Sequence, residues 1–257
     1  MSQISLAESF AALHRPGAPL ILYNAWDAGS ARAIAKAGAR AIATGSWSLA
    51  AAQGYADGQQ IPLEFALQIL ARITASVDMP VTFDFEAGFA ERRVNLATNT
   101  ERVIAAGAVG VNFEDRHMGG AGLLPIGEQA ERIGTLRHAA EATGVPLFIN
   151  ARTDVFSQGS KPADHPALMK EALARARAYA EAGANGLFVP GLVTAELIGA
   201  LCEETILPVN IMQTGSAPDN ATLARLSVAR ISHGPAPWIT AMNRVTDAAQ
   251  AALTIGN

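Results

Sequence analysis

Short apolar runs alternate with longer amphipathic segments along the chain, and this pairing recurs eight times. The apolar runs are bounded by Pro or Gly and lead into polar or charged residues. Such runs are typical of strands that are buried on both faces of a parallel sheet. We therefore predict eight strands, at residues 19–24, 41–45, 80–89, 109–116, 146–153, 186–191, 208–213 and 229–234.

The segments between these runs have the periodicity of helices that cover a sheet on one side. Asp27 is the expected N-cap of the first such helix, and Gly38 is its expected left-handed cap. The predicted helices are residues 27–37, 63–76, 94–106, 129–143, 167–182 and 237–253, and residues 195–204 form a further amphipathic segment that contains Cys202. Cys202 is the single cysteine, so no disulfide can form within the chain, and we interpret it as a helix-packing residue.

Eight strand–helix units predict an α/β protein with a closed (β/α)8 TIM barrel. No shift in composition marks a linker, so we expect a single barrel domain over residues 1–257. An open, doubly wound sheet would give a similar pattern. No Gly-x-Gly-x-x-Gly motif opens the first helix, which argues against a dinucleotide-binding version of that fold.

Composition narrows the choice of ligand. Half of the 257 residues are hydrophobic and 16% are charged, which is enough apolar material for a large core and argues against disorder. The net charge of −4 and the lack of a basic cluster argue against nucleic acid as a partner. The N-terminus has no signal-peptide pattern, and no apolar run reaches the roughly 20 residues that span a bilayer. We expect a cytoplasmic protein with a small ligand and no membrane partner.

Acidic residues follow two neighbouring strands at the points where their apolar runs end. Asp84 and Glu86 are two residues apart, so they would share one face of a strand, and Glu114 ends the next strand. Adjacent carboxylates repel unless a cation or a shared proton relieves the repulsion, and a hard divalent cation such as Mg²⁺ does so. The alternative is that these acids cap helices or pair with arginines in solvent.

Further polar residues fall at the ends of other strands. In a barrel, the carboxyl ends of all strands meet at one mouth, which is where barrels place their chemistry. The residues predicted to converge there are Asp84, Glu86, Glu114, Arg152, Asn210 and His233. This convergence is the main functional argument that the residues themselves provide.

Several spaced motifs resemble the isocitrate lyase and phosphoenolpyruvate mutase superfamily. They are Tyr23-Asn-Ala-Trp-Asp-Ala-Gly-Ser-Ala-Arg32, Gly54-Tyr-Ala-Asp-Gly58, Asp84-x-Glu86-x-Gly88, Asn112-Phe-Glu-Asp115, Asn150-Ala-Arg-Thr-Asp154 and Gly183-Ala-Asn-Gly-Leu-Phe-Val-Pro190. The resemblance implies a barrel whose last helix is exchanged between subunits, a homodimer or homotetramer, and Mg²⁺, with Mn²⁺ as an alternative, that holds a 2-oxo acid or its enolate.

The resemblance also implies a metal site of specific residues. Asp84 matches the direct metal ligand, and Asp57, Glu86 and Glu114 match the acids that hold metal-bound waters. The best-known family members have Asp where this chain has Glu86, so the longer side chain moves the charge and alters the water shell.

The same resemblance assigns residues to the substrate. Arg152 matches the arginine that binds the substrate carboxylate, and its planar fork suits bidentate binding of that group; its alternative is an internal salt bridge to an acid of the mouth. The loop after the second strand offers the backbone amides of Gly45, Ser46 and Trp47. Asn210 is a further expected substrate ligand.

The loop after the fourth strand departs from the family pattern. Residues 116–122 read Arg-His-Met-Gly-Gly-Ala-Gly, without the catalytic Cys of the lyase branch or the Lys and Asn of the mutase branch. Gly119, Gly120 and Gly122 suit a mobile lid. His117 is either an acid–base group or a solvated side chain, and His233 either protonates the product, binds the distal carboxylate or pairs within the mouth.

These observations predict a Mg²⁺-dependent lyase that cleaves a carbon–carbon bond of a small 2-oxo acid of oxaloacetate type. Loss of CO₂ needs no specialised lid, because CO₂ leaves without a proton and the enolate is stabilised by the core site. The alternatives are phosphonopyruvate hydrolase or phosphoenolpyruvate mutase chemistry, which share the metal site, and a non-catalytic 2-oxo acid binding protein.

Overall fold

Parallel strands form a ring in the computed structural model, which describes residues 1–118, 120–157 and 161–254. The strands are β1 (Leu20–Leu22), β2 (Asn24–Ala25), β3 (Ile42–Thr44), β4 (Val81–Asp84), β5 (Gly110–Glu114), β6 (Phe148–Arg152), β7 (Gly186–Phe188), β8 (Val209–Met212) and β9 (Arg230–Ser232). Every pairing is parallel, and the order around the sheet is β1-β9-β8-β7-β6-β5-β4-β3-β2.

The first strand segment closes the ring. β1 and β2 are separated only by Tyr23, and they pair with opposite ends of the sheet, β1 with β9 and β2 with β3. The two pieces therefore occupy the position of one barrel strand. This confirms the predicted (β/α)8 TIM barrel and excludes the open doubly wound sheet.

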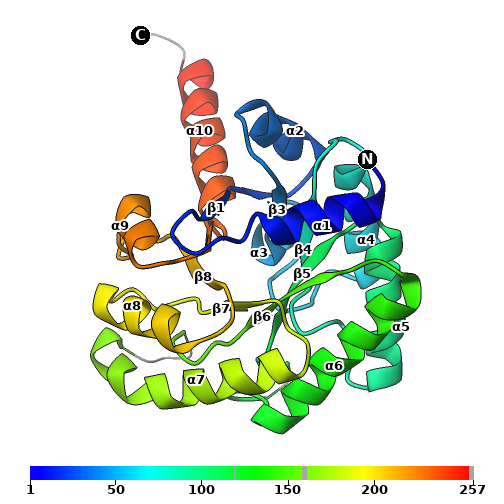
Figure 1. Ribbon diagram of the computed structural model, residues 1–257. Helices are drawn as coiled ribbons and strands as arrows, with labels where there is room; N and C mark the ends of the chain where they lie inside the picture. The colour runs from blue at the N-terminus through cyan, green and yellow to red at the C-terminus, as the bar shows by residue number, and fades with distance from the viewer. Residues whose placement is uncertain (119, 158–160, 255–257) are drawn as a thin grey trace.

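Helices surround the ring (Figure 1). They are α1 (Gln3–Ala12), α2 (Ala28–Lys36), α3 (Ser46–Ala51), α4 (Leu63–Thr74), α5 (Arg93–Ala105), α6 (Ile126–Thr143), the 3₁₀ turn η1 (Pro162–Asp164), α7 (His165–Glu181), α8 (Ala195–Glu204), α9 (Asn220–Arg225) and α10 (Ala236–Leu253). The predicted helices all form, with ends within about three residues. Asp27 caps α2 through the amide of Ser30, and Gly38 has the expected positive φ of 95°.

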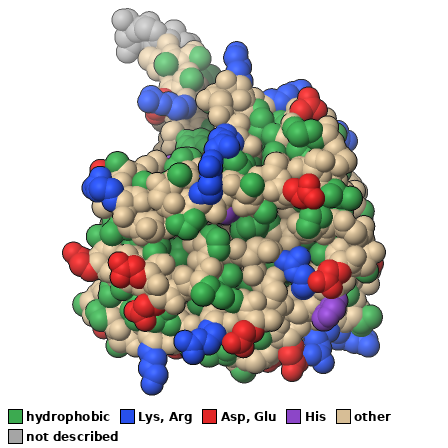
Figure 2. Space-filling view, viewed as in Figure 1, with side chains coloured by type: hydrophobic (Ala, Val, Ile, Leu, Met, Phe, Trp, Pro, Cys, Tyr) green, Lys and Arg blue, Asp and Glu red, His purple; other side chains and the backbone are tan. Residues whose placement is uncertain are grey.

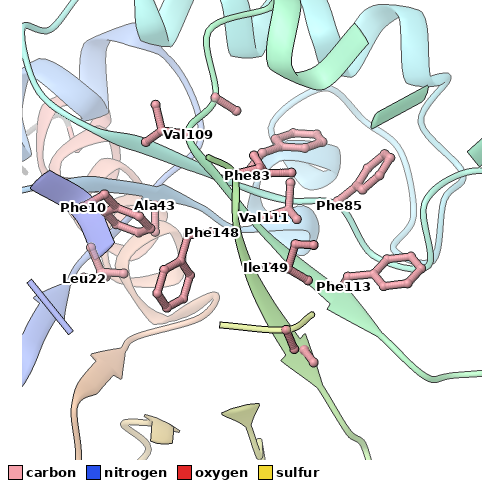
Figure 3. Close-up of a cluster of buried hydrophobic side chains, with 14 of the residues drawn as sticks. Phe10, Leu22, Ala43, Phe83, Phe85, Val109, Val111, Phe113, Phe148 and Ile149 are labelled. Atoms are coloured by element: carbon pink, nitrogen blue, oxygen red, sulfur yellow. The ribbon is translucent and has the colours of Figure 1, made fainter. Parts of the chain in front are cut away.

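Three helices have no counterpart in the sequence prediction, and α1 matters most among them. It crosses the front of the barrel in Figure 1, and its Phe10 is fully buried with Leu22, Ala43 and Phe148 (Figure 3). The rings of Phe10 and Phe148 lie 5.5 Å apart, edge to face. A Cβ atom on Gly110 would come within 2.8 Å of Phe10, so the glycine makes room for this ring. Helix α1 thus closes the end of the barrel where the strands begin.

A second apolar layer lies outside the strands. Strand residues alternate, so Phe83, Val111 and Ile149 face the surrounding helices while their neighbours in sequence face the barrel interior. All three are buried. Because strands are covered on both sides, their sequences are nearly continuous apolar runs, which is why they were recognisable.

Helix α10 stands away from the barrel (Figure 1). Only Pro237 in this helix is buried, and Ile239, Val245 and Leu253 are exposed. Acidic and basic side chains are interspersed over the face seen in Figure 2. Among the helices of the described residues, none has both the length and the apolar composition needed to cross a bilayer.

Candidate active site

The mouth at the carboxyl ends of the strands brings together several of the predicted site residues. Asp84, Glu114 and Arg152 are the last residues of β4, β5 and β6. Cα pairing aligns Asp84 with Asn112 and Glu114 with Arg152. Alternation directs these side chains to the barrel interior rather than to the helices.

One carboxylate oxygen of Asp84 is hydrogen-bonded to the backbone, and the other has no partner among the described residues. Its Oδ2 accepts a hydrogen bond of 2.9 Å from the amide of Ser46, at the start of α3. Its own amide donates to the Oγ1 of Thr44. Its Oδ1 is buried and has no hydrogen-bond partner among the described residues. A buried carboxylate oxygen without a donor is costly, which indicates that a ligand belongs there.

Glu86 reaches the site by a route that corrects the sequence prediction. The strand was expected to run to residue 89, but β4 ends at Asp84 and Glu86 has a left-handed φ of 49°. Its carbonyl accepts from the amide of Glu114, and its Oε2 accepts from the amide of Gln59 at 2.8 Å. A turn therefore places Glu86 at the mouth, at the cost of strained backbone.

The acids of the mouth raise one another's pKa. Burial, followed by repulsion from Asp84 and Asp57, raises the pKa of Glu86 to about 8. Burial also raises the pKa of Glu114 to about 7, although Arg152 acts in the opposite direction. Asp57 lies in an exposed loop, yet desolvation and repulsion from Asp84 raise its pKa as well. The four predicted metal-site acids thus act on one another electrostatically.

Arg152 is held between two acids. Its Nε and Nη2 donate to the two carboxylate oxygens of Asp154 at 2.7 and 3.0 Å, and its Nη1 lies 2.9 Å from Oε2 of Glu114. Burial lowers the pKa of Arg152, but Glu114 and Asp154 outweigh this and raise it above its usual value. The internal salt bridge that was the alternative for Arg152 is therefore present in this structure, and Asp154 is a partner that the sequence analysis did not single out.

Asn210 lies inside the barrel, below the mouth. It is fully buried, its Oδ1 accepts from Asn150, and its Nδ2 donates to the Oγ of Ser232 and to backbone carbonyls. Asn150 also donates to Asn112. The bond from Asn150 to Asn210 joins β6 to β8, which are not neighbours, so these two amides point toward the barrel axis. Both polar groups of the Asn210 side chain are thus engaged inside the barrel.

The loop amides after β3 are used in different ways. The amide of Gly45 donates to the carbonyl of Ala25, and that of Ser46 donates to Asp84. The amide of Trp47 lies in the first turn of α3, where N–H groups have no acceptor within the helix. The Trp47 ring packs edge to face with Trp238 of α10 at 5.3 Å.

The two histidines predicted to take part in catalysis, His117 and His233, occupy different surroundings. His117 is exposed in the loop after β5, and its amide bonds to the carbonyl of Gly122; Gly119 of this loop lies outside the described residues. His233 follows β9, its amide and that of Gly234 donate to Oδ1 of Asn24, and its ring lies 5.2 Å from that of Tyr23. Burial lowers the pKa of His233, so the neutral imidazole is favoured.

Two cavities border the loop after β5. One, of about 500 Å³, is lined by Arg152, Asp154, Ser157 and the loop residues Arg116, Gly120, Ala121 and Gly122. The other, of about 600 Å³, is lined by His117, Gly58, Phe89, Glu91 and Arg132, among others, and Arg116 also borders it. None of the four metal-site acids lines either cavity, although Gly58 of the larger one follows Asp57 directly. Arg152 and Asp154 line only the smaller cavity, which is therefore the one that borders the candidate substrate ligand.

The residues present fit a hard cation held largely through water. Their donors are all carboxylate oxygens, which Mg²⁺ prefers, and Asp84 presents an unpartnered one. Across residues 1–118, 120–157 and 161–254, no three His, Cys, Asp or Glu side chains are close enough to bind one ion together. Mg²⁺ keeps several of its waters in proteins, so one direct carboxylate with others behind the water shell suits this arrangement.

Comparison with known proteins places the chain in a family. The family model described as phosphoenolpyruvate phosphomutase matches residues 10–253. This chain belongs to that family. It is thus a member of the isocitrate lyase and phosphoenolpyruvate mutase superfamily, as the motifs had indicated.

Individual relatives within the superfamily have different activities. A solved structure from Burkholderia cenocepacia J2315, provisionally described as a phosphonomutase, is 46% identical, with a TM-score of 0.95 over 98% of this chain and 100% of that one. Oxaloacetate decarboxylase of Bradyrhizobium sp. strain BTAi1 is 30% identical over 74% of this chain and 66% of its own length. The 2-methylisocitrate lyase of Escherichia coli K12 is 28% identical over 96% and 84%.

Proposed function

We propose that this phosphoenolpyruvate phosphomutase family member is a Mg²⁺-dependent carbon–carbon lyase that acts on a small 2-oxo acid of oxaloacetate type. The observation that carries the proposal is the unpartnered oxygen of Asp84 within a set of mutually repelling acids. Such a set is poorly stable by itself and becomes favourable when a divalent cation binds. Similarity to an oxaloacetate decarboxylase supports the choice of substrate.

In this proposal, Asp84 holds Mg²⁺ directly, and Asp57, Glu86 and Glu114 bind its water ligands. When bound, Mg²⁺ supplies a positive charge that polarises the carbonyl of the 2-oxo acid and favours the enolate. Mn²⁺ would suit the same oxygen donors. The elevated pKa values of Glu86 and Glu114 mean that binding of the cation releases protons.

Arg152 binds and orients the substrate carboxylate. Its guanidinium already forms two-pronged contacts with Asp154, which fixes its plane next to the smaller cavity. A substrate carboxylate would take over the contact that Nη1 makes with Glu114, and Glu114 would then be free to bind a water. Of the amides after β3, that of Trp47 is the one left to bind the substrate, because those of Gly45 and Ser46 donate to Ala25 and Asp84.

The chain offers a simple route for decarboxylation. The bond from C3 to the departing carboxylate breaks, its electron pair moves into the enolate, and CO₂ leaves without needing a proton. A proton must then reach C3 from water or from a side chain. The half-buried His233 lies at the end of β9 and either donates that proton or hydrogen-bonds to the distal carboxylate.

A second function of this site is supported by a different observation. The 46% identical structure is provisionally described as a phosphonomutase, which favours cleavage of a carbon–phosphorus bond in a phosphonopyruvate-like substrate. Cleavage of 2-methylisocitrate is disfavoured, because residues 116–122 contain no Cys and the single Cys202 is on α8. His117 is the one titratable acid–base group of this loop and remains the candidate that a lid-dependent reaction would use.

Steady-state assays separate these functions. Purified protein is supplied in turn with oxaloacetate, phosphonopyruvate and 2-methylisocitrate, with Mg²⁺, with Mn²⁺ or with a chelator. We expect turnover of oxaloacetate that is abolished by the chelator. Because free divalent ions also decarboxylate oxaloacetate slowly, Asp84→Asn protein at the same metal concentration is the control.

Other results would change the assignment. Turnover of phosphonopyruvate alone would replace the lyase with the carbon–phosphorus reaction. Tight Mg²⁺-dependent binding of oxalate with no turnover of any substrate would identify a binding protein. A protein that binds neither Mg²⁺ nor oxalate would contradict the proposal as a whole.

We further propose that the protein forms a homo-oligomer in which α10 packs against a neighbouring subunit. This helix stands off the barrel and exposes Ile239, Val245 and Leu253. An isolated helix of this length gains little stability without packing. Light scattering of the intact chain and of a Val245→Asp variant tests this, and a wild-type monomer would contradict it.

A further inference from the structure

Arg230 is a charged residue deep inside the barrel that the proposed chemistry does not use. It is the first residue of β9, and only 1% of its surface is exposed. Its Nη2 donates to Oδ1 of Asn112 at 3.1 Å, on a strand across the barrel. Its guanidinium carbon lies 5.9 Å from the centre of the Phe10 ring, which belongs to the apolar cluster drawn in Figure 3.

This buried cation has no carboxylate as a direct partner. In the described part of the chain, Arg230 forms no ion pair, and its Nε and Nη1 have no acceptor within hydrogen-bond distance. Burial lowers its pKa to about 9, which leaves it charged at neutral pH. The charge also affects His14, because burial and Arg230 together lower the pKa of this histidine to about 3.

Such an arrangement is unfavourable for folding. Desolvating a guanidinium costs several kcal/mol unless an anion compensates, and apolar residues of similar volume are often as stable or more stable. A cation–π contact and one hydrogen bond recover only part of that cost. Stability therefore does not explain why an arginine occupies this position.

The acid that Arg230 acts upon is Asp84. Attraction to Asp84 is the effect that offsets part of the lowering of the Arg230 pKa. Asn112, which accepts from Arg230, is paired in register with Asp84. The guanidinium thus lies beneath the mouth, bonded to the register neighbour of the residue that presents an unpartnered oxygen.

We propose that Arg230 is a positioning residue of the candidate site, a fixed cation beneath the mouth that sets the balance between its affinities for metal and for anion. The inference rests on the proposed function. A positive charge at this place weakens the binding of a divalent cation and strengthens the binding of a 2-oxo acid dianion and its enolate. Without it, an acid-rich mouth that binds the metal would repel the substrate.

The test uses two probes, Mn²⁺ alone and oxalate at saturating Mn²⁺, with the intact protein. For Arg230→Met and Arg230→Gln, we expect Mn²⁺ to bind about tenfold more tightly and oxalate about tenfold more weakly, because one unit charge is removed at intermediate effective dielectric. Arg230→Lys keeps the charge and should stay within about twofold of wild type. Electron paramagnetic resonance and calorimetry measure the two affinities.

A matched control removes a positive charge far from the mouth. Arg137 donates to the carbonyl of Gly183 and to Asn185, and Arg137→Met should leave both affinities unchanged. Thermal melting adds an independent readout, since the neutral Arg230 variants should be at least as stable as wild type. If Arg230 served only to stabilise the fold, the neutral variants would be less stable than wild type.

The outcomes separate the two levels of the argument. Opposite shifts in the two affinities, with stability retained, support the inference. Shifts of the same sign, no shifts, or loss of folding in both neutral variants would overturn the inference about Arg230. None of these results would contradict the proposed metal site. If wild-type protein binds neither Mn²⁺ nor oxalate, the proposed function fails first, and this inference fails with it.

Discussion

Glu114 and Asp115 are neighbours in sequence, yet they belong to two regions with opposite character. Asp115 is fully buried and accepts from the hydroxyl of Tyr179 at 2.8 Å, from Nη1 of Arg175 at 3.0 Å and from the amide of Asp154. Arg175 also donates to the carbonyl of Leu124. This network ties the end of the loop after β5 to α7, and its acid has a donor for each oxygen.

Glu114 faces the mouth, where acids outnumber their partners. Within the described part of the chain, Glu114 pairs only with Arg152, which it shares with Asp154, and Asp84 nearby has an oxygen with no donor. Burial raises the pKa of both Glu114 and Asp115, but only Asp115 has several donors that act against this effect. The comparison shows that a buried acid is structural when its partners are complete and is a candidate ligand when they are not.

The largest expected effect tests the incomplete region. Asp84→Ala should reduce Mg²⁺-dependent oxalate binding by about a thousandfold or more, because the direct ligand of the cation is lost. Its free energy of unfolding should change by less than about 1 kcal/mol, since removing one of several repelling charges offsets the lost bond to Ser46. Calorimetry and chemical denaturation measure both.

Asp78 provides the control for Asp84. It is an exposed acid that precedes β4 at the opposite end of the barrel. Asp78→Asn should alter neither oxalate binding nor stability. Oxalate affinity retained in Asp84→Ala would contradict the metal assignment directly.

The complete region should respond in stability instead. Asp115→Ala leaves Arg175 buried without its partner, so we expect a loss of about 3–5 kcal/mol in the free energy of unfolding. Glu171 is the other partner of Arg175 but is 46% exposed, so Glu171→Ala should cost about 1 kcal/mol or less. Urea denaturation compares the two. Equal costs would show that the buried network is not what stabilises this region.

A smaller effect is expected where the two regions meet, at Arg152. Arg152→Lys keeps the charge but loses the planar fork that contacts Asp154, so oxalate affinity at saturating Mg²⁺ should fall about tenfold to a hundredfold. Arg116 borders the same cavity but is exposed, and Arg116→Lys should change affinity by less than about threefold. Identical affinities in the two variants would argue against Arg152 as the carboxylate ligand.

The smallest effect is a pH dependence of stability. Glu86 has a pKa of about 8 in the folded protein against 4.5 ordinarily, so its contribution to stability is complete below pH 4.5 and is lost as the pH rises through 8. The metal-free protein should therefore melt a few degrees lower at pH 9 than at pH 5, because a loss of about 1 kcal/mol lowers the melting temperature of a chain of this size by about 2–4 °C.

Added Mg²⁺ should reverse this dependence, because it favours the ionised acids and binds more tightly as the pH rises. Glu86→Gln replaces the titratable carboxyl group with a neutral amide and serves as the control. The melting temperature of this variant should depend less on pH. A melting temperature of wild type that rises from pH 5 to pH 9 without metal would show that other groups dominate.

Several site residues could be found from sequence because their placement is local. Asp84, Glu114 and Arg152 end apolar runs, and in parallel strands those ends meet at one mouth. Glu86 was found for a partly wrong reason, since a turn and not strand alternation brings it there. Helix α1 was missed because only Ala7 and Phe10 of its ten residues are buried, which leaves a weak apolar pattern.

The remaining features depend on contacts between distant segments. Asp154 could have been singled out from its place two residues after Arg152, but its two-pronged pairing is a matter of side-chain geometry. Arg230 interrupts an apolar run, which is a visible signal, yet an arginine in a strand is usually paired or at an edge. That it contacts Asn112 across the barrel, and no acid among the residues that the structure describes, follows only from closure of the ring.

The sequence by itself determined the barrel and the strand-end residues Asp84, Glu114 and Arg152 at its mouth, because strand runs, their polar ends and their order are properties of short segments. Only the tertiary structure decided which charges are satisfied. Asp115 acquired its partners from α7 and β6, whereas Asp84 kept an oxygen free and Arg230 kept two donors free. Hydrogen-bond satisfaction in a buried site depends on the distances between side chains from separate strands, and local periodicity carries no information about these distances.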